Sequence, residues 1–313
     1  MPWRGLEMIQ TLPSLLPVFL LIALGYALRA RGWIDPGFWG PAERLTYLVF
    51  FPALLFRNTA MAHGVGPDLA PLAVALTFGV LAVAAAVMVA RSRLGLGGPS
   101  FTSVFQGAIR PNVYLAIAAA AALFGDRGMS LVSVGVAVVV PIVNLLAVLV
   151  LARYANPGGQ PAGLGRVIGQ VLRNPLILSC LAGGLLGLTG VGVPPLVDPI
   201  LEILGRAALP LGLMAVGAGL DPRTLRGAGP AVLGTVGLKM LVVPALTWAA
   251  CLVLGVAADT TAVCVIYAAM PTSASSYVLA RQMGGDGPLL AGIVTAGTIA
   301  SAAVVPLLMI LLG

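Results

Sequence analysis

The sequence predicts an all-α membrane protein with about ten transmembrane helices, arranged as two inverted repeats of five helices each. Three observations predict this fold class. The chain is rich in apolar residues and poor in charge. Its apolar residues fall in blocks long enough to cross a bilayer, and its prolines recur at a fixed offset between the two halves of the chain.

The composition argues against an ordinary soluble fold. Of 313 residues, 59% are hydrophobic and 9% are charged, whereas about 25% of residues are charged in a typical soluble domain. The apolar blocks have the length that a helix needs to cross about 30 Å of hydrocarbon. The net charge of +7 comes from basic residues spread over the loops without interleaved aromatics, so we expect no binding of nucleic acid.

The hydrophobic blocks predict ten spans. They are expected at about 10–31, 38–60, 68–90, 100–124, 129–152, 167–189, 196–220, 230–255, 260–281 and 288–312. Helices are the expected element because each helix bonds its own backbone polar groups, which lipid cannot do.

Proline positions reveal an internal repeat. An offset of 158 residues relates Pro17 to Pro175, Pro36 to Pro194, Pro41 to Pro199, and Pro52 to Pro210. Farther along the chain the offset becomes 160, as between Pro111 and Pro271. We therefore expect a first repeat at 1–155, a cytoplasmic linker at 156–165 and a second repeat at 166–313. Five spans is an odd number, so the second repeat should be inverted relative to the first.

The distribution of Lys and Arg predicts the orientation in the membrane. One side of the predicted topology holds Arg29, Arg31, Arg44, Arg91, Arg93, Arg153, Arg166, Arg173, Arg223, Arg226 and Arg281. The other side holds Arg4, Arg57, Arg127 and Arg206. Because cytoplasmic loops carry the excess of positive charge, the chain is expected to be a multi-pass protein of the cell (inner) membrane with both termini outside.

Polar residues accompany the prolines of the fourth and ninth spans. A proline inside a spanning helix frees backbone polar groups, and paired interruptions at equal depth are typical of a binding site near the bilayer midplane. Helix breaks are predicted at Pro52, Pro111, Pro210 and Pro271. The candidate binding residues of the fourth and ninth spans are Arg110, Pro111, Asn112, Tyr114, Pro271, Thr272, Ser273 and Ser276. For the serines, helix packing through small residues is the alternative.

Two cations fall within predicted spans, Arg110 and Lys239. No Asp or Glu occurs between Pro71 and Gly125 or between Thr224 and Ala258, so neither cation has an evident acidic partner. Either cation could balance a bound anion. The alternatives are that Arg110 extends to the cytoplasmic interface and that Lys239 bonds to freed carbonyls.

The sequence offers no catalytic or metal-binding constellation. The acidic residues lie near predicted helix ends or in loops, and the three cysteines lack the spacing of metal ligands. We therefore expect neither a cofactor nor a metal site, and no enzymatic activity. A membrane-embedded enzyme and a passive channel remain as rival hypotheses.

The order and spacing of several motifs resemble the auxin efflux carrier family, which includes bacterial malonate and dicarboxylate permeases and the plant PIN auxin exporters. The motifs are the stretch from Tyr47 to Phe56, Arg110-Pro111-Asn112, Arg173-Asn174-Pro175, the stretch from Ala207 to Leu211, the stretch from Lys239 to Pro244, and Pro271 followed by Tyr277-Val278-Leu279-Ala280. The resemblance implies that the fourth and ninth helices cross at their prolines and that members move organic anions by an elevator-like alternation. It also places Asn112 at the crossing and Asn144 beside the same pocket.

The expected function is secondary transport of a small organic anion, such as a mono- or dicarboxylate or an auxin-like acid. A sodium-coupled organic-anion symporter resembling the bile-acid carriers is the alternative. The expected partners are this anion and the lipid bilayer. The sequence leaves open the solute, the direction of transport, the coupling ion and whether the chain forms a homodimer.

Overall fold

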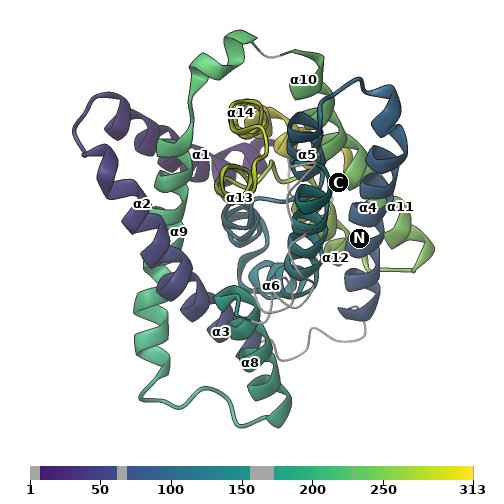
Figure 1. The fold of residues 1–313 in the computed structure, drawn as a ribbon. Helices are drawn as coiled ribbons and strands as arrows, with labels where there is room; N and C mark the ends of the chain where they lie inside the picture. Colours follow the sequence, from purple (N-terminus) through teal and green to yellow (C-terminus); the bar gives the residue numbers. More distant parts are fainter. Residues whose placement is uncertain (1–7, 62–68, 156–172, 228, 313) are drawn as a thin grey trace.

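The apolar blocks of the sequence form helices throughout the described part of the chain. The computed structural model describes residues 8–61, 69–155, 173–227 and 229–312 (Figure 1). The predicted linker at 156–165 lies outside these residues, as do Arg4 and Arg166 from the charge count. Within the described ranges the regular elements are helical and no strand forms, as the sequence predicts.

The helices are arranged along the chain as follows: α1 (Met8–Ala30), α2 (Pro36–Leu45), α3 (Phe51–Ala60), α4 (Leu69–Ala90), α5 (Gly98–Ile109), α6 (Val113–Tyr154), α8 (Pro175–Thr189), α9 (Asp198–Gly219), α10 (Pro230–Gly237), α11 (Val243–Val253), α12 (Ala258–Ala269), α13 (Ser275–Met283) and α14 (Gly287–Leu312). π-Helical turns at Thr46–Phe50 and Leu238–Val242 join α2 to α3 and α10 to α11.

Six helical segments among the described residues are long and apolar enough to cross a membrane. They are Pro13–Ala30, Leu69–Arg93, Val113–Tyr154, Asp198–Gly219, Pro230–Val253 and Gly287–Leu312. This number is lower than the predicted ten because several predicted spans are divided into shorter helices, such as α12 and α13. In addition, α6 changes direction at Gly125, whose φ of 58° and ψ of −146° are open to glycine but costly for other residues.

Two of the four predicted helix breaks are wrong. Helix α9 continues through Pro210, and the backbone stays helical from the π-helical turn into α3, where Pro52 lies in the first turn. The π-helical turn precedes Pro52 and shifts the hydrogen-bond register, with Phe51 N–H donating to the carbonyl of Thr46, so the helix continues past the proline. At Pro210 the loss of one bond bends or weakens a helix without ending it. At Pro111 and Pro271, in contrast, the helices do end.

The helices pack in two groups. One group, which we call the small bundle, contains α1, α2, α3, α8 and α9; α1 packs on α9, and α3 packs on both α8 and α9. The other group, the large bundle, contains α4 to α6 and α10 to α14, with α4 on α11 and α12 on α6. Figure 1 shows α2, α3, α8 and α9 on one side of the molecule and α4 and α11 on the other. Most of the buried apolar core lies around α6.

Glycines allow α1 and α9 to approach closely within the small bundle. A Cβ atom added at Gly217 would lie 1.8 Å from the carbonyl oxygen of Ile22, and one added at Gly25 would lie 2.0 Å from that of Met214. Small residues at such contacts are the usual means by which helices pack in lipid, where no hydrophobic effect drives them together.

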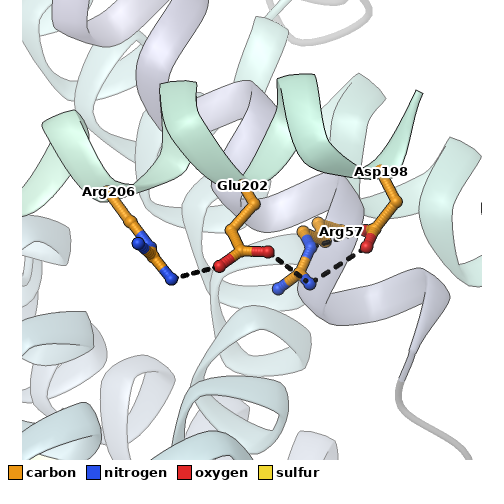
Figure 2. A network of polar contacts seen from close by, with 4 residues as sticks. All are labelled: Arg57, Asp198, Glu202 and Arg206. Atoms are coloured by element: carbon orange, nitrogen blue, oxygen red, sulfur yellow. Dashed lines mark hydrogen bonds and ion pairs between the residues drawn. The ribbon is translucent and has the colours of Figure 1, made fainter. Parts of the chain in front are cut away.

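An ion-pair network also joins helices of the small bundle. Arg57 on α3 donates from Nε to Asp198 Oδ1 at 2.6 Å and from Nη2 to Glu202 Oε2 at 3.3 Å. Arg206, one turn farther along α9, donates to the other carboxylate oxygen of Glu202. Figure 2 shows the three α9 side chains in a row, with Arg57 reaching between the two acids. All four side chains are partly exposed, so the network holds α3 against α9 only modestly.

Candidate functional site

The helix interruptions at Pro111 and Pro271 are in direct contact. Residues 110–112 are extended between α5 and α6, and residues 270–274 separate α12 from α13. The backbone N–H of Asn112 donates to the carbonyl of Pro271 at 2.8 Å, and the N–H of Ser273 donates to the carbonyl of Arg110 at 3.1 Å. Pro111 and Thr272 thus form a short antiparallel bridge. The backbone groups that the prolines release are satisfied by each other across this crossing.

Side chains at the crossing satisfy further groups at the helix ends. Asn112 Oδ1 accepts from the N–H groups of Tyr114 and Leu115 at 3.1 and 3.2 Å, and so caps the N-terminus of α6. Thr272 Oγ1 donates to the carbonyl of Gly107 in the last turn of α5 at 2.7 Å. Both side chains are almost fully buried. Thr272 therefore helps to build the crossing.

Lys239 has a similar structural contact. Its Nζ donates to the carbonyl of Ala268, in the last turn of α12, at 2.5 Å. The side chain is only 1% exposed and forms no ion pair with the described residues. A cation at the C-terminal end of a helix is favoured by the helix dipole. Of the two readings of Lys239, this contact favours bonding to a freed carbonyl.

A cavity of about 610 Å³ lies beside the crossing and between the two bundles. The small bundle lines it with residues from α2, the following turn and α8, and the large bundle lines it with the crossing, α6 and α13. Its polar lining residues are Glu43, Arg44, Tyr47, Arg110, Asn112, Tyr114, Asn144, Asn174, Ser273, Ser275 and Gln282. Arg44 and Gln282 are exposed, so the cavity reaches the surface on their side.

Arg110 is the buried cation of this cavity. Its guanidinium donates from Nη1 to Gln106 Oε1 at 3.0 Å, and from Nη2 to Asn144 Oδ1 at 2.9 Å and Ser275 Oγ at 3.3 Å. The residue is 7% exposed, so its guanidinium lies buried within the protein. Its partners are neutral, and its charge stays uncompensated by any described acid within ion-pair distance. The three bonds fix the orientation of the guanidinium, as a preorganised anion site requires.

Asn112 contributes an unused donor. Because Oδ1 accepts two backbone N–H groups, the orientation of the amide is defined and Nδ2 is turned away from the helix end. Nδ2 is buried and has no hydrogen-bond partner among the described residues. A buried polar group without a partner costs free energy, so a ligand that accepts a hydrogen bond from Nδ2 gains by removing that cost.

The structure brings together six of the candidate binding residues. Arg110, Pro111, Asn112, Tyr114, Asn144 and Ser273 line the cavity. Lys239, Pro271, Thr272 and Ser276 do not. Pro271 and Thr272 contribute to the crossing itself, and Ser276 is fully buried near the start of α13.

Sequence reasoning missed several lining residues from the small bundle, among them Glu43, Tyr47 and Asn174. Asn174 offered a local signal. It precedes Pro175 and caps α8, with Oδ1 accepting from Leu176 N at 3.0 Å, so an Asn-Pro pair at the start of a span marks a helix N-terminus. Glu43 gave no such signal, because it lies close to the start of its predicted span, where an acid at the membrane interface is ordinary.

An aromatic stack lies between the bundles. The rings of Phe51 on α3 and Tyr114 on α6 have centroids 4.3 Å apart and are inclined by 5°. Phe51 is fully buried, and a Cβ atom at Gly212 of α9 would lie 2.9 Å from its ring. The stack therefore packs tightly against α9, and its Tyr114 ring also lines the cavity.

Comparisons with known proteins find similarity to membrane transport proteins. Residues 164–309 match the family model described as "Membrane transport protein". An "Uncharacterized transporter" of Methanothermobacter thermautotrophicus is 24% identical over 299 residues, which cover 94% of this chain and 96% of that protein. A "Probable auxin efflux carrier component 5b" of Oryza sativa subsp. japonica is 28% identical over 155 residues, 46% of this chain and 41% of that protein. The chain is thus similar to membrane transport proteins, among them a probable auxin efflux carrier component.

Proposed function

We propose that this transporter is a secondary carrier of a small organic anion, such as a mono- or dicarboxylate or an auxin-like acid, across the cell membrane. The observation that supports this most directly is the pairing of Arg110 and Asn112 at one cavity. The buried guanidinium of Arg110 is held by neutral partners, and the buried Nδ2 of Asn112 has no hydrogen-bond partner within the described ranges. A carboxylate placed there would accept hydrogen bonds from both groups and balance the charge of Arg110.

The size and lining of the cavity suit a small organic solute. A volume of about 610 Å³ falls within the range of roughly 300 to 1,000 Å³ that is common for small-molecule sites. Valines on α6 supply apolar surface next to the polar groups, namely Val140, Val143 and Val148. A solute with a carboxylate and a short apolar body would satisfy both parts of the lining.

We also propose that the chain has ten spans in two inverted repeats, 1–155 and 166–313. Two features support the repeat. The interruptions at Pro111 and Pro271 keep the offset of 160 found in the sequence, and they meet in an antiparallel bridge, as inverted copies would. We count α5 with the first part of α6 as one span, the remainder of α6 as the next, and α12 with α13 as another.

The two bundles suggest an elevator-like mechanism. In this proposal the small bundle is the scaffold, and the large bundle carries the crossing and the solute past it. The cavity reaches the surface beside Arg44 and Gln282, which belong to the more basic side of the predicted topology. That side is expected to be cytoplasmic. The conformation described would then be open to the inside, with both termini outside, and the Phe51–Tyr114 stack would close the outer side.

The test is uptake of radiolabelled malonate, malate and indole-3-acetate into proteoliposomes. We expect saturable uptake of at least one acid by the wild type and a loss of uptake in Asn112→Ala. Thr189→Ala, at an exposed position of α8 outside the cavity, is the control. Equal uptake by Asn112→Ala and the wild type would remove the crossing as the site. Replacing Na⁺ by choline separates sodium symport from other coupling, and non-saturating flux would indicate a channel.

A further inference from the structure

The cavity has one carboxylate in the described part of its lining, that of Glu43 on α2. Arg44 follows it on the same helix, and Arg110 faces the cavity from the crossing. Tyr47 and Tyr114, which are neutral, complete the titratable groups of the described lining. Any solute in the cavity therefore experiences a positive charge from the large bundle and a negative charge from the small bundle.

Among the residues that the structure describes, Glu43 differs from most other acids in having no hydrogen-bond or ion-pair partner for its carboxylate. Asp198 and Glu202 pair with Arg57, Asp259 pairs with Arg127, and Asp286 accepts from Ser100. The side chain of Glu43 forms neither a hydrogen bond nor an ion pair with the described residues, although it is partly buried. The charge of Glu43 is therefore not neutralised by another described side chain.

Arg44 does not cancel this charge. Its side chain is exposed at the mouth of the cavity, where water and salt screen it. Arg110 is already bonded to three neutral groups, which fix the orientation of its guanidinium. One carboxylate of a solute suffices to balance Arg110, and a second carboxylate would enter a space that contains the like charge of Glu43. Two like charges confined in one cavity repel each other, and they do so more strongly than in bulk water wherever protein replaces solvent.

We propose that Glu43 determines specificity by excluding dicarboxylates, so that the solute class of this transporter is small monocarboxylates. The inference rests on the proposed function, since it assigns Arg110 and Asn112 to one carboxylate of the solute. It adds a second recognition element from the opposite bundle. Residues of both bundles would then recognise the solute, at the interface along which the bundles are expected to move.

The experiment compares two unlabelled acids of equal chain length, pentanoate and glutarate. Each competes with the uptake of whichever radiolabelled acid the wild type transports into proteoliposomes. The pH is 7.5, where both competitors are fully ionised. For the wild type we expect the inhibition constant of glutarate to exceed that of pentanoate at least about tenfold. Glu43→Asp keeps the charge and should keep this preference. Glu43→Gln removes the charge in a side chain of nearly equal volume and should bring the ratio close to one.

Asp126→Asn is the matched control, because it removes an exposed carboxylate at the turn within α6, outside the cavity lining. It should leave the ratio of the two inhibition constants unchanged. Equal inhibition of the wild type by both probes would overturn the inference, as would an unchanged preference in Glu43→Gln. If the wild type transports neither kind of acid, the proposed function itself fails. The wild-type ratio is informative even if a variant does not reach the membrane.

Discussion

The two ends of the Asn112 amide have different tasks, and two substitutions separate them. Oδ1 caps α6 by accepting from Tyr114 and Leu115, whereas Nδ2 has no hydrogen-bond partner in the described part of the chain. Asn112→Ala removes both atoms. Asn112→Asp keeps an acceptor at the cap position and replaces only the donor, in a side chain of nearly the same shape.

The magnitudes follow from these contacts. Loss of an N-cap costs roughly 0.5 to 2 kcal/mol, so Asn112→Ala should be less stable than the wild type, and Asn112→Asp should not be. Loss of a hydrogen bond to a charged ligand costs about 1.5 to 3 kcal/mol. This corresponds to roughly a 10- to 150-fold weaker affinity for the anion in both variants. The negative charge of Asp should add further repulsion.

The assay is solute affinity from concentration-dependent uptake into proteoliposomes, together with the apparent melting temperature in detergent. The expected pattern is that Asn112→Asp melts like the wild type yet binds the anion at least about tenfold more weakly. An Asn112→Asp protein with wild-type affinity would refute the reasoning, because Nδ2 would then have no role in binding. A large drop in its melting temperature would instead refute the assignment of Oδ1 as the cap.

Three further predictions concern the framework. Gly217→Ala should destabilise the small bundle by about 1 to 3 kcal/mol through overpacking against α1. Gly219→Ala should not, because no atom lies within 4 Å of the added Cβ. Apparent melting temperatures test both variants. Lys239→Met should change solute affinity less than about threefold, because the lysine bonds to Ala268 and lies outside the cavity lining; a larger change in uptake kinetics would assign it to the site. Asp198→Asn should lower stability by about 1 kcal/mol or less, as expected for a partly exposed ion pair, and thermal melting with and without high salt measures this.

The crossing could be predicted from the sequence because its determinant is local and repeated. Proline ends a helix wherever its surroundings can satisfy the freed backbone, and the offset of 160 indicated which two prolines meet. The same reasoning failed at Pro210, since the single lost bond did not end α9. The presence of a proline predicts that a helix is weakened at that point. Whether the helix ends there depends on how the neighbouring helices pack around it.

The candidate site was predictable only on the side of the large bundle. Arg110 and Asn112 stood out as polar residues within an apolar span, Asn144 was implied by the family resemblance, and all three line the cavity. Glu43 did not stand out, because its place near the end of a span is ordinary for an acid, and only the packing of α2 against the crossing gives it significance. For Lys239 the sequence left two alternatives open, a role in anion binding and a bond to a freed carbonyl. Only the position of α12, whose Ala268 carbonyl accepts from Lys239, favours the second.

The bridge between residues 111 and 272 is made of main-chain atoms. Its two flanking hydrogen bonds, at 2.8 and 3.1 Å, involve no side chain of either segment. Substitutions of lining residues outside the crossing, such as Asn144, therefore leave these two bonds in place. In evolutionary terms, the cavity lining can adapt to a new solute while the main-chain contact between the two interruptions is kept.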